Sequence, residues 1–285
     1  MNPKMSQKID EKFVIKKCEQ LLSELCIDSV PVNLNLIGSY FGVESIQDAT
    51  IEEAGKVIPQ NNGSYVVLVR RSDPPGRKRF TVAHELGHLI VPGAMGGHGV
   101  VDYEVGEFDK HKNIEFLCDT AAASLLMPNK LFDDFVKGKR FNFITVMEVS
   151  TRFNVSLEAA ALQMVKRDQS KRAVIVWELS HKPQEEFLLA TSTLPGFEAY
   201  IPKKQLRVRY AYGLSGRELI PKSKSLDETE GVVAEAFADV EKNIYKSKQS
   251  MIFSNTLSLD CHCEAMSTID GRVLSLITKS IKLKK

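Results

Sequence analysis

The chain has 285 residues, of which 43% are hydrophobic and 26% charged, so it can hold one large or two modest globular domains. Its formal net charge of +2 excludes a strong overall field for nucleic acid or membrane surfaces. No apolar run approaches the roughly 20 residues of a membrane-spanning helix. The five cysteines are an odd number, which argues against a disulfide framework. Residues 1–13 lack the apolar core of a signal peptide, so we expect a cytoplasmic protein with no membrane partner.

The first part of the chain predicts two short helices, a strand and then a longer helix. Apolar residues at helical spacing predict helices over residues 10–27 and 34–41. Residues 65–69, Tyr-Val-Val-Leu-Val, predict a strand between two turns. A longer helix follows and ends before the glycine-rich residues 93–112, which predict a loop long enough to border a functional site.

That longer helix carries the most informative pattern, His-Glu-Leu-Gly-His at residues 84–88. On a helix, His84 and His88 lie one turn apart on the same face, where two neutral imidazoles can bind Zn²⁺. Glu85 is rotated by about 100° around the helix, so it is not a ligand. It can instead hold a metal-bound water and accept its proton. The pattern predicts a zinc hydrolase, most simply a peptidase, with Glu85 as catalytic base.

A catalytic zinc site needs a third protein ligand and an open position. We expect the third ligand from the next predicted helix, residues 113–126, where Glu115 is the first candidate. Asp119 follows one turn later, in a position to accept a hydrogen bond from the ring of His84. Both helices are otherwise apolar, so these polar groups need partners. Alternative third ligands are His98, Glu104, Glu107 and His111.

Two further features surround the motif. Gly87 inside a helix costs about 1 kcal/mol relative to alanine, which predicts close approach of a strand or a second helix. Four residues are candidates for the hydrogen-bond donor that would stabilise the oxyanion of the reaction. One of them, Arg79, is better explained as a cap or ion-pair residue near the helix start. These candidates are Arg79, His98, Tyr103 and His111.

Residues 131–170 predict further helices, and 149–160 have the shape of a helix-turn-helix, which could contact DNA or dock a repressor. Basic residues lie nearby: Lys137, Lys139, Arg140, Arg152, Lys166 and Arg167. From residue 171 the pattern changes to strands, such as 173–179 and 187–190, with a helix at about 230–246. We interpret Trp177 as a core residue. Cys261-His262-Cys263 is more simply incidental or structural than a second metal site.

These elements predict an α+β protein in three parts. Residues 1–130 form a zincin-like metallopeptidase domain, in which the His-Glu-x-x-His helix packs on a second ligand-bearing helix and a short sheet. Residues 131–170 form the helical segment, and 171–285 form an α+β C-terminal domain.

Residues 79–88, Arg-Phe-Thr-Val-Ala-His-Glu-Leu-Gly-His, resemble the Arg-Phe-Thr-(apolar)-Ala-His-Glu-(Leu/Ile)-Gly-His signature of the ImmA/IrrE family of metallo-endopeptidases. Residues 115–128 are similar to that family's Glu-x-x-Ala-Asn-x-Phe-Ala-x-x-Leu-Leu-Met-Pro helix. Residues 30–34 and 41–43 resemble its lead-in segment, and the resemblance covers about residues 10–128. The chain departs from the pattern at three positions: Cys118 for alanine, Asp119 for asparagine and Ala121 for phenylalanine. We interpret Cys118 as a packing residue rather than a fourth ligand.

The resemblance implies that His84, His88 and Glu115 bind zinc and that Glu85 is the general base. It also implies cleavage of a helix-turn-helix transcriptional repressor, which switches on phage, mobile-element or stress-response genes. It further implies a regulatory domain resembling a GAF fold at residues 171–285. Zn²⁺ is the expected metal and Mn²⁺ the alternative.

Two other functions fit the sequence. One is a non-enzymatic, zinc-stabilised regulator that binds a repressor or DNA, and the other is a zinc hydrolase acting on a small amide. The intact Glu85 weighs against the regulator, because a structural metal site does not need a carboxylate in the base position.

Overall fold

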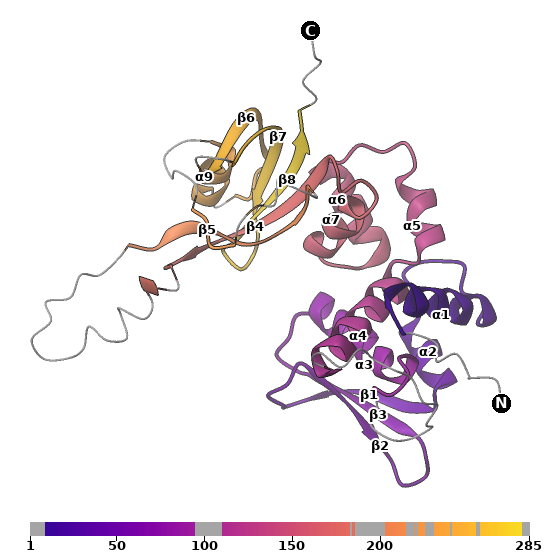
Figure 1. Ribbon diagram of the computed structural model, residues 1–285. Coiled ribbons are helices and arrows are strands. Elements are labelled where there is room, and N and C mark those ends of the chain that lie inside the picture. The colour runs from indigo at the N-terminus through magenta and orange to yellow at the C-terminus, as the bar shows by residue number, and fades with distance from the viewer. Residues whose placement is uncertain are drawn as a thin grey trace, which may run out of the picture. The chain divides into compact units, whose positions relative to one another are not determined.

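The computed structural model describes residues 9–94, 110–182, 184–185, 203–214, 220, 222–225, 231–239, 241–254 and 257–280 (Figure 1). The chain divides into two compact units. The N-terminal unit is Met1–Gly138 with Glu148–Ser156, and the C-terminal unit is Lys139–Met147 with Leu157–Lys285. Each unit combines helices with a sheet, so the α+β prediction is confirmed, while the division into three domains stays a prediction. Within the described residues, no helix has the length and apolar character needed to cross a bilayer.

The N-terminal unit contains a three-stranded sheet of β1 (Val43–Ala49), β2 (Gly55–Pro59) and β3 (Tyr65–Arg70) in the order β1-β3-β2. The central strand β3, predicted from its β-branched run, pairs parallel with β1 and antiparallel with β2. Its Val67 and Val69 are buried. In the described part of the chain, β2 therefore pairs on one side only and is an edge strand.

Four helices accompany this sheet: α1 (Glu11–Glu24), α2 (Leu34–Tyr40), α3 (Pro75–Ile90) and α4 (Lys110–Leu126). Helix α3 packs on β2 and β3 and runs beside α4, which also contacts α1 (Figure 1). The helices expected over 10–27 and 34–41 are present with slightly shorter bounds.

Local sequence explains where these helices start. The Asp10 carboxylate accepts a hydrogen bond of 2.9 Å from the Phe13 N–H and caps α1. Helix α3 starts with Pro75, whose missing N–H costs nothing in a first turn. Short helix α5 (Asn129–Val136) follows α4, and its Phe132 packs on Phe153.

The C-terminal unit is built on a five-stranded antiparallel sheet in the order β5-β4-β8-β7-β6. Its strands are β4 (Arg172–Ser180), β5 (Gln205–Gly213), β6 (Tyr245–Ser254), β7 (Leu257–Ser267) and β8 (Val273–Lys279). Helix α9 (Val232–Ala238) packs on β6, β7 and β8, and helix α7 (Leu157–Val165) packs on β4 and β5. Trp177 is fully buried in the core between the sheet and α9, as predicted, and its indole N–H donates to Ser275 Oγ at 2.7 Å.

The prediction of a helix at about 230–246 is wrong in its second half, because α9 ends at Ala238 and β6 begins at Tyr245. The side chain of Asp239 accepts hydrogen bonds from the N–H groups of Glu241 and Asn243, at 2.8 and 2.7 Å, and so turns the chain out of the helix. The strand expected at 187–190 lies outside the described residues.

Cys261 and Cys263 are buried in the core beside α9, whereas His262 between them is exposed. Alternate residues of a strand point to opposite faces. His262 therefore does not share a metal site with its two neighbours, in agreement with the interpretation of this triplet as incidental or structural.

Helix α6 (Phe143–Phe153), a turn at 154–156 and helix α7 follow one another along the chain in the order expected of a helix-turn-helix. Every residue of α7 is buried or half-buried. In a DNA-binding helix-turn-helix, the second helix presents an exposed face to the major groove. This burial weighs against α7 as a recognition helix, and DNA binding stays a prediction.

Candidate metal centre

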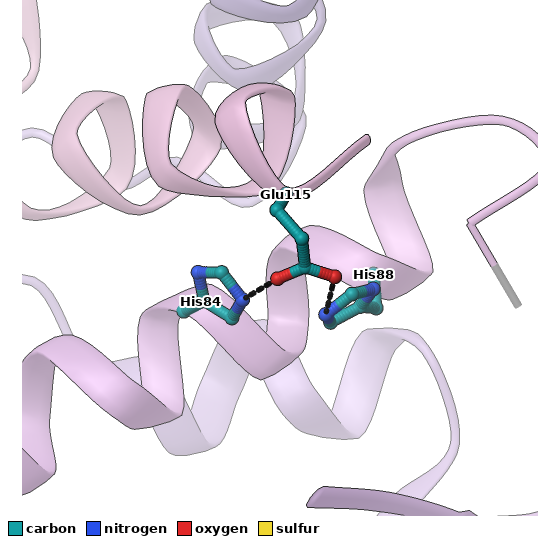
Figure 2. Close-up of side chains that lie close together, drawn as sticks. All are labelled: His84, His88 and Glu115. Atoms are coloured by element: carbon teal, nitrogen blue, oxygen red, sulfur yellow. Dashed lines mark hydrogen bonds and ion pairs between the residues drawn. The ribbon is translucent and has the colours of Figure 1, made fainter. Parts of the chain in front are cut away.

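The three predicted ligands converge at the crossing of α3 and α4. In Figure 2 the carboxylate of Glu115 lies between the imidazole rings of His84 and His88. Its Oε2 is 3.1 Å from His84 Nε2, and its Oε1 is 3.8 Å from His88 Nε2. One potential ligand atom from each residue lies within 4.8 Å of the other two. The two histidines, one helical turn apart, and one carboxylate from the next helix therefore form a single cluster.

This donor set fits a divalent metal. Two imidazole nitrogens and one carboxylate oxygen are the protein ligands of many catalytic zinc sites, which leave a further position open. The side chains of His84 and His88 are 16% and 18% exposed, so the site is sheltered and still accessible. Among the described residues, no other group of three His, Cys, Asp or Glu side chains is arranged to hold an ion.

Asp119 lies on the opposite side of the His84 ring, with its Oδ1 2.9 Å from His84 Nδ1. Burial alone lowers the pKa of His84, but the hydrogen bond and charge of Asp119, with Glu85 and Glu115, outweigh it and raise that pKa. Because Asp119 occupies Nδ1, Nε2 is the nitrogen directed toward Glu115. A ring held in this way presents one fixed nitrogen to a metal.

Gly87 explains how the two helices come so close. A Cβ at Gly87 would lie 3.0 Å from the carbonyl oxygen of Cys118 and 3.1 Å from its Cα. The backbone of α4 therefore occupies the space that a side chain on α3 would need. This close approach is the one that glycine in the motif predicted, and the second helix rather than a strand makes it.

Glu85 points into the same site from the sheet side of α3. Its side chain is buried, with 7% of the residue exposed. Burial raises the pKa of Glu85 to about 7, and the charge of Glu115 adds to this, while His84 and a backbone hydrogen bond from Val57 oppose it. A carboxyl group that changes protonation near neutral pH can both take up and release a proton.

Strand β2 approaches Glu85 from the other side. A Cβ at Gly55 would lie 2.8 Å from Glu85 Oε1 and would also collide with Thr81 Cγ2. With the Val57 hydrogen bond, two positions of β2 therefore hold the carboxylate in place. Sequence reasoning missed both, although Val57-Ile58-Pro59 before the Asn61-Asn62-Gly63 turn is a hairpin signal.

A cleft of about 630 Å³ opens over these residues. It is bordered on one side by residues 53–57, which include the start of β2, and on the other by α3 and α4. Arg77 and Phe80 of α3 also line it, together with the three candidate ligands, Glu85 and Asp119. The cleft is large enough for a segment of a substrate rather than only a water molecule.

Of the remaining candidates, Arg79 is the one whose side chain the structure describes, and it is not among the residues that line the cleft. The guanidinium of Arg79 donates to the Val32 carbonyl oxygen at 2.7 Å, so it joins α3 to the segment before α2. His98, Tyr103, Glu104 and Glu107 lie outside the described residues, as does the side chain of His111.

Residues 40–164 match the family model of the IrrE N-terminal-like domain. Radiation response metalloprotease IrrE of Deinococcus deserti is 30% identical over 134 residues, which are 44% of this chain and 47% of that protein. The protein of the same name from Deinococcus radiodurans is 28% identical over 116 residues, 40% of this chain and 34% of that protein. The match thus spans about half or less of each relative.

A solved structure of a Mycobacterium tuberculosis transcriptional regulator has the same fold over 95% of this chain and 77% of that chain, with a TM-score of 0.59 and 15% identity. At this identity the likeness concerns the fold alone. The family match, in contrast, covers β2, β3, α3 and α4, which carry the cluster described above. Residues 40–164 thus match an IrrE N-terminal-like domain, which supports the resemblance of this part of the chain to the ImmA/IrrE family.

Proposed function

We propose that this chain is a zinc-dependent endopeptidase that cleaves a helix-turn-helix transcriptional repressor and thereby derepresses phage, mobile-element or stress-response genes. The observation that carries the proposal is the convergence of two groups in one cleft. His84, His88 and Glu115 offer a three-ligand metal site, and the buried Glu85 lies beside them as an acid–base group.

His84, His88 and Glu115 would hold the ion. Bound Zn²⁺ supplies Lewis acidity to a peptide carbonyl and lowers the pKa of water from about 15.7 to about 7. Glu85 would accept a proton at its carboxylate as water attacks the carbonyl carbon, and would then deliver that proton to the leaving amine. Burial, which raises the pKa of Glu85 in the metal-free chain, favours the uptake of that proton.

The strand beside the base supports a peptide as the substrate. Strand β2 pairs with β3 on one side, and the Val57 N–H on its other side bonds to the Glu85 carboxylate. An extended peptide lying in the cleft along β2 would place its carbonyl groups next to Glu85. This arrangement favours a peptide bond within a chain over a small amide.

The repressor assignment draws on the family. The relatives from Deinococcus are named radiation response metalloproteases, which supports a protease that acts in regulation. The experiment therefore uses a panel of candidate repressors.

The test is incubation of the purified full chain with helix-turn-helix proteins encoded near it, with and without Zn²⁺ or Mn²⁺, followed by mass spectrometry of the products. Glu85→Gln removes the acid–base group and no ligand, so metal binding should persist while cleavage is lost. The matched control is Glu53→Gln, which removes an exposed carboxylate bordering the same cleft. Cleavage retained in Glu85→Gln would refute the proposal.

A metal-bound protein that cleaves no member of the panel would favour the non-enzymatic regulator. In that case binding to a repressor or to DNA should survive Glu85→Gln, which a pull-down and a mobility-shift assay with the same variants would detect.

A further inference from the structure

Cys118 on α4 lies directly behind the second histidine of the cluster. Its Sγ is 3.5 Å from His88 Nδ1, within reach of a hydrogen bond to sulfur, and the residue is fully buried. The next residue, Asp119, makes the corresponding contact with His84 Nδ1. Consecutive residues of α4 thus contact the same ring atom of the two histidines on α3.

We propose that Cys118 is a positioning residue for His88, which rests on the metal site of the proposed function. It holds the imidazole through Nδ1 so that Nε2 faces the ion, as Asp119 does for His84. The distances support a common orientation, because both Nε2 atoms face the Glu115 carboxylate, at 3.1 and 3.8 Å. The nitrogen that contacts sulfur is the one that does not face Glu115.

The backbone of Cys118 is fixed in position. Its carbonyl oxygen and Cα occupy the space beside Gly87, the residue immediately before His88. The short Cys118 side chain therefore starts from a defined point at the helix crossing, next to the ring that it contacts. A side chain reaching from a loop would not have this constraint.

The same geometry argues against a role as a fourth ligand. The cluster whose potential ligand atoms lie within 4.8 Å of one another contains His84, His88 and Glu115 and does not include the Cys118 sulfur. A sulfur that accepts the Nδ1–H of a ligating imidazole fixes its tautomer and orientation. Thiol sulfur is a weak acceptor, so the effect on affinity should be smaller than that of Asp119.

The experiment measures the Zn²⁺ affinity of the full chain and of its Cys118→Ala and Cys18→Ala variants by competition with a chelating dye. Cys18 is the matched control: it is also fully buried, and its Sγ contacts the Ala121 carbonyl oxygen of α4 at 3.9 Å. Both variants remove one buried sulfur beside α4. We expect Cys118→Ala to raise the Zn²⁺ dissociation constant by up to about tenfold. Cys18→Ala should leave it unchanged.

A second measurement separates positioning from packing. In the Zn²⁺-loaded protein with ¹⁵N-labelled histidine, the His88 Nδ1–H signal should exchange with solvent faster in Cys118→Ala than in the parent. Cys118→Ser, whose hydroxyl can also accept this hydrogen bond, should partly restore both affinity and protection. The His84 signal serves as an internal reference.

The outcomes are distinct. If Cys118→Ala binds Zn²⁺ as tightly as Cys18→Ala and the His88 signal is unchanged, Cys118 does not position His88, while the proposed function stands. If the parent binds no Zn²⁺, the positioning role of Cys118 and the proposed function are both refuted. A thiolate-to-metal absorption band in the Co²⁺-loaded parent that Cys118→Ala abolishes would make Cys118 a ligand and overturn the positioning role.

Discussion

The carboxylate of Glu85 packs directly against the backbone of Gly55. A Cβ at Gly55 would lie 2.8 Å from Glu85 Oε1, closer than unbonded side chains approach one another. The candidate acid–base group is therefore held between helix α3 and strand β2. Its position depends on the absence of a side chain at one residue of the sheet.

Gly55→Ala should displace Glu85 and lower the rate of cleavage by about 10- to 100-fold, because a shift of about 1 Å in a catalytic group has effects of this size. Overpacking should also lower the free energy of unfolding by about 1–3 kcal/mol. The control is Gly76→Ala on α3, where a Cβ would have nothing within 4 Å. Cleavage rates of both variants, with urea unfolding curves, are the measurement. Equal rates would show that β2 does not constrain Glu85.

Glu85→Gln should stabilise the metal-free protein above neutral pH. The pKa of Glu85 is about 7 in the folded chain, against about 4.3 in an unfolded one. Between these values the folded state binds more protons, so the free energy of unfolding of the parent falls as pH rises. Glutamine removes this ionisation, and its side-chain carbonyl can still accept the Val57 hydrogen bond.

We expect Glu85→Gln to be more stable than the parent by about 1–3 kcal/mol at about pH 8, with no difference at about pH 4. Urea unfolding with a chelator present, at both pH values, measures this. A stability difference that does not depend on pH would mean that Glu85 has an ordinary pKa.

Asp119→Ala should weaken metal binding without removing a ligand. Without the 2.9 Å contact to Nδ1, the His84 ring loses its fixed tautomer. The Zn²⁺ dissociation constant should rise by about 10- to 100-fold. Asp48→Ala, which removes an exposed carboxylate paired with Lys78, is the comparison. Similar affinities of the two variants in a chelator competition assay would contradict this role of Asp119.

Ser275→Ala should destabilise the C-terminal unit, because it leaves the buried indole N–H of Trp177 without the Ser275 Oγ acceptor. The expected cost is about 1–3 kcal/mol. Trp177 is the one tryptophan of the sequence, so its fluorescence during urea unfolding reports on this unit. Ser247→Ala, at an exposed position of β6, should have no such effect.

The core of the site could be predicted because it depends on local spacing. Residues four apart on a helix share a face, which placed His84 beside His88, and the same rule linked Glu115 with Asp119. The cost of burying carboxylates in an apolar helix then pointed to a shared partner. These arguments need only the sequence of two helices.

The surroundings of the site depend on contacts between distant parts of the chain. Residues 55–59 are mostly half-buried, with no strict alternation, and the approach of Gly55 to Glu85 arises only when β2 packs on α3. Similarly, residues 245–254 form a strand because they pair along β7, a contact that local periodicity does not encode. At residues 245 and 246, the last two of the helix expected for 230–246, this pairing replaces the helical conformation.

The close contact between Gly87 and the backbone of Cys118 has a consequence for how the protein gains and loses its metal. The distance between the histidines on one helix and the glutamate on the other is constrained by this packing, so we expect the site to be assembled before an ion arrives. Small domains in which the ion itself drives folding unfold when it is withdrawn. This domain should stay folded, so that metal supply could switch the chemistry on and off while the amount of protein stays constant.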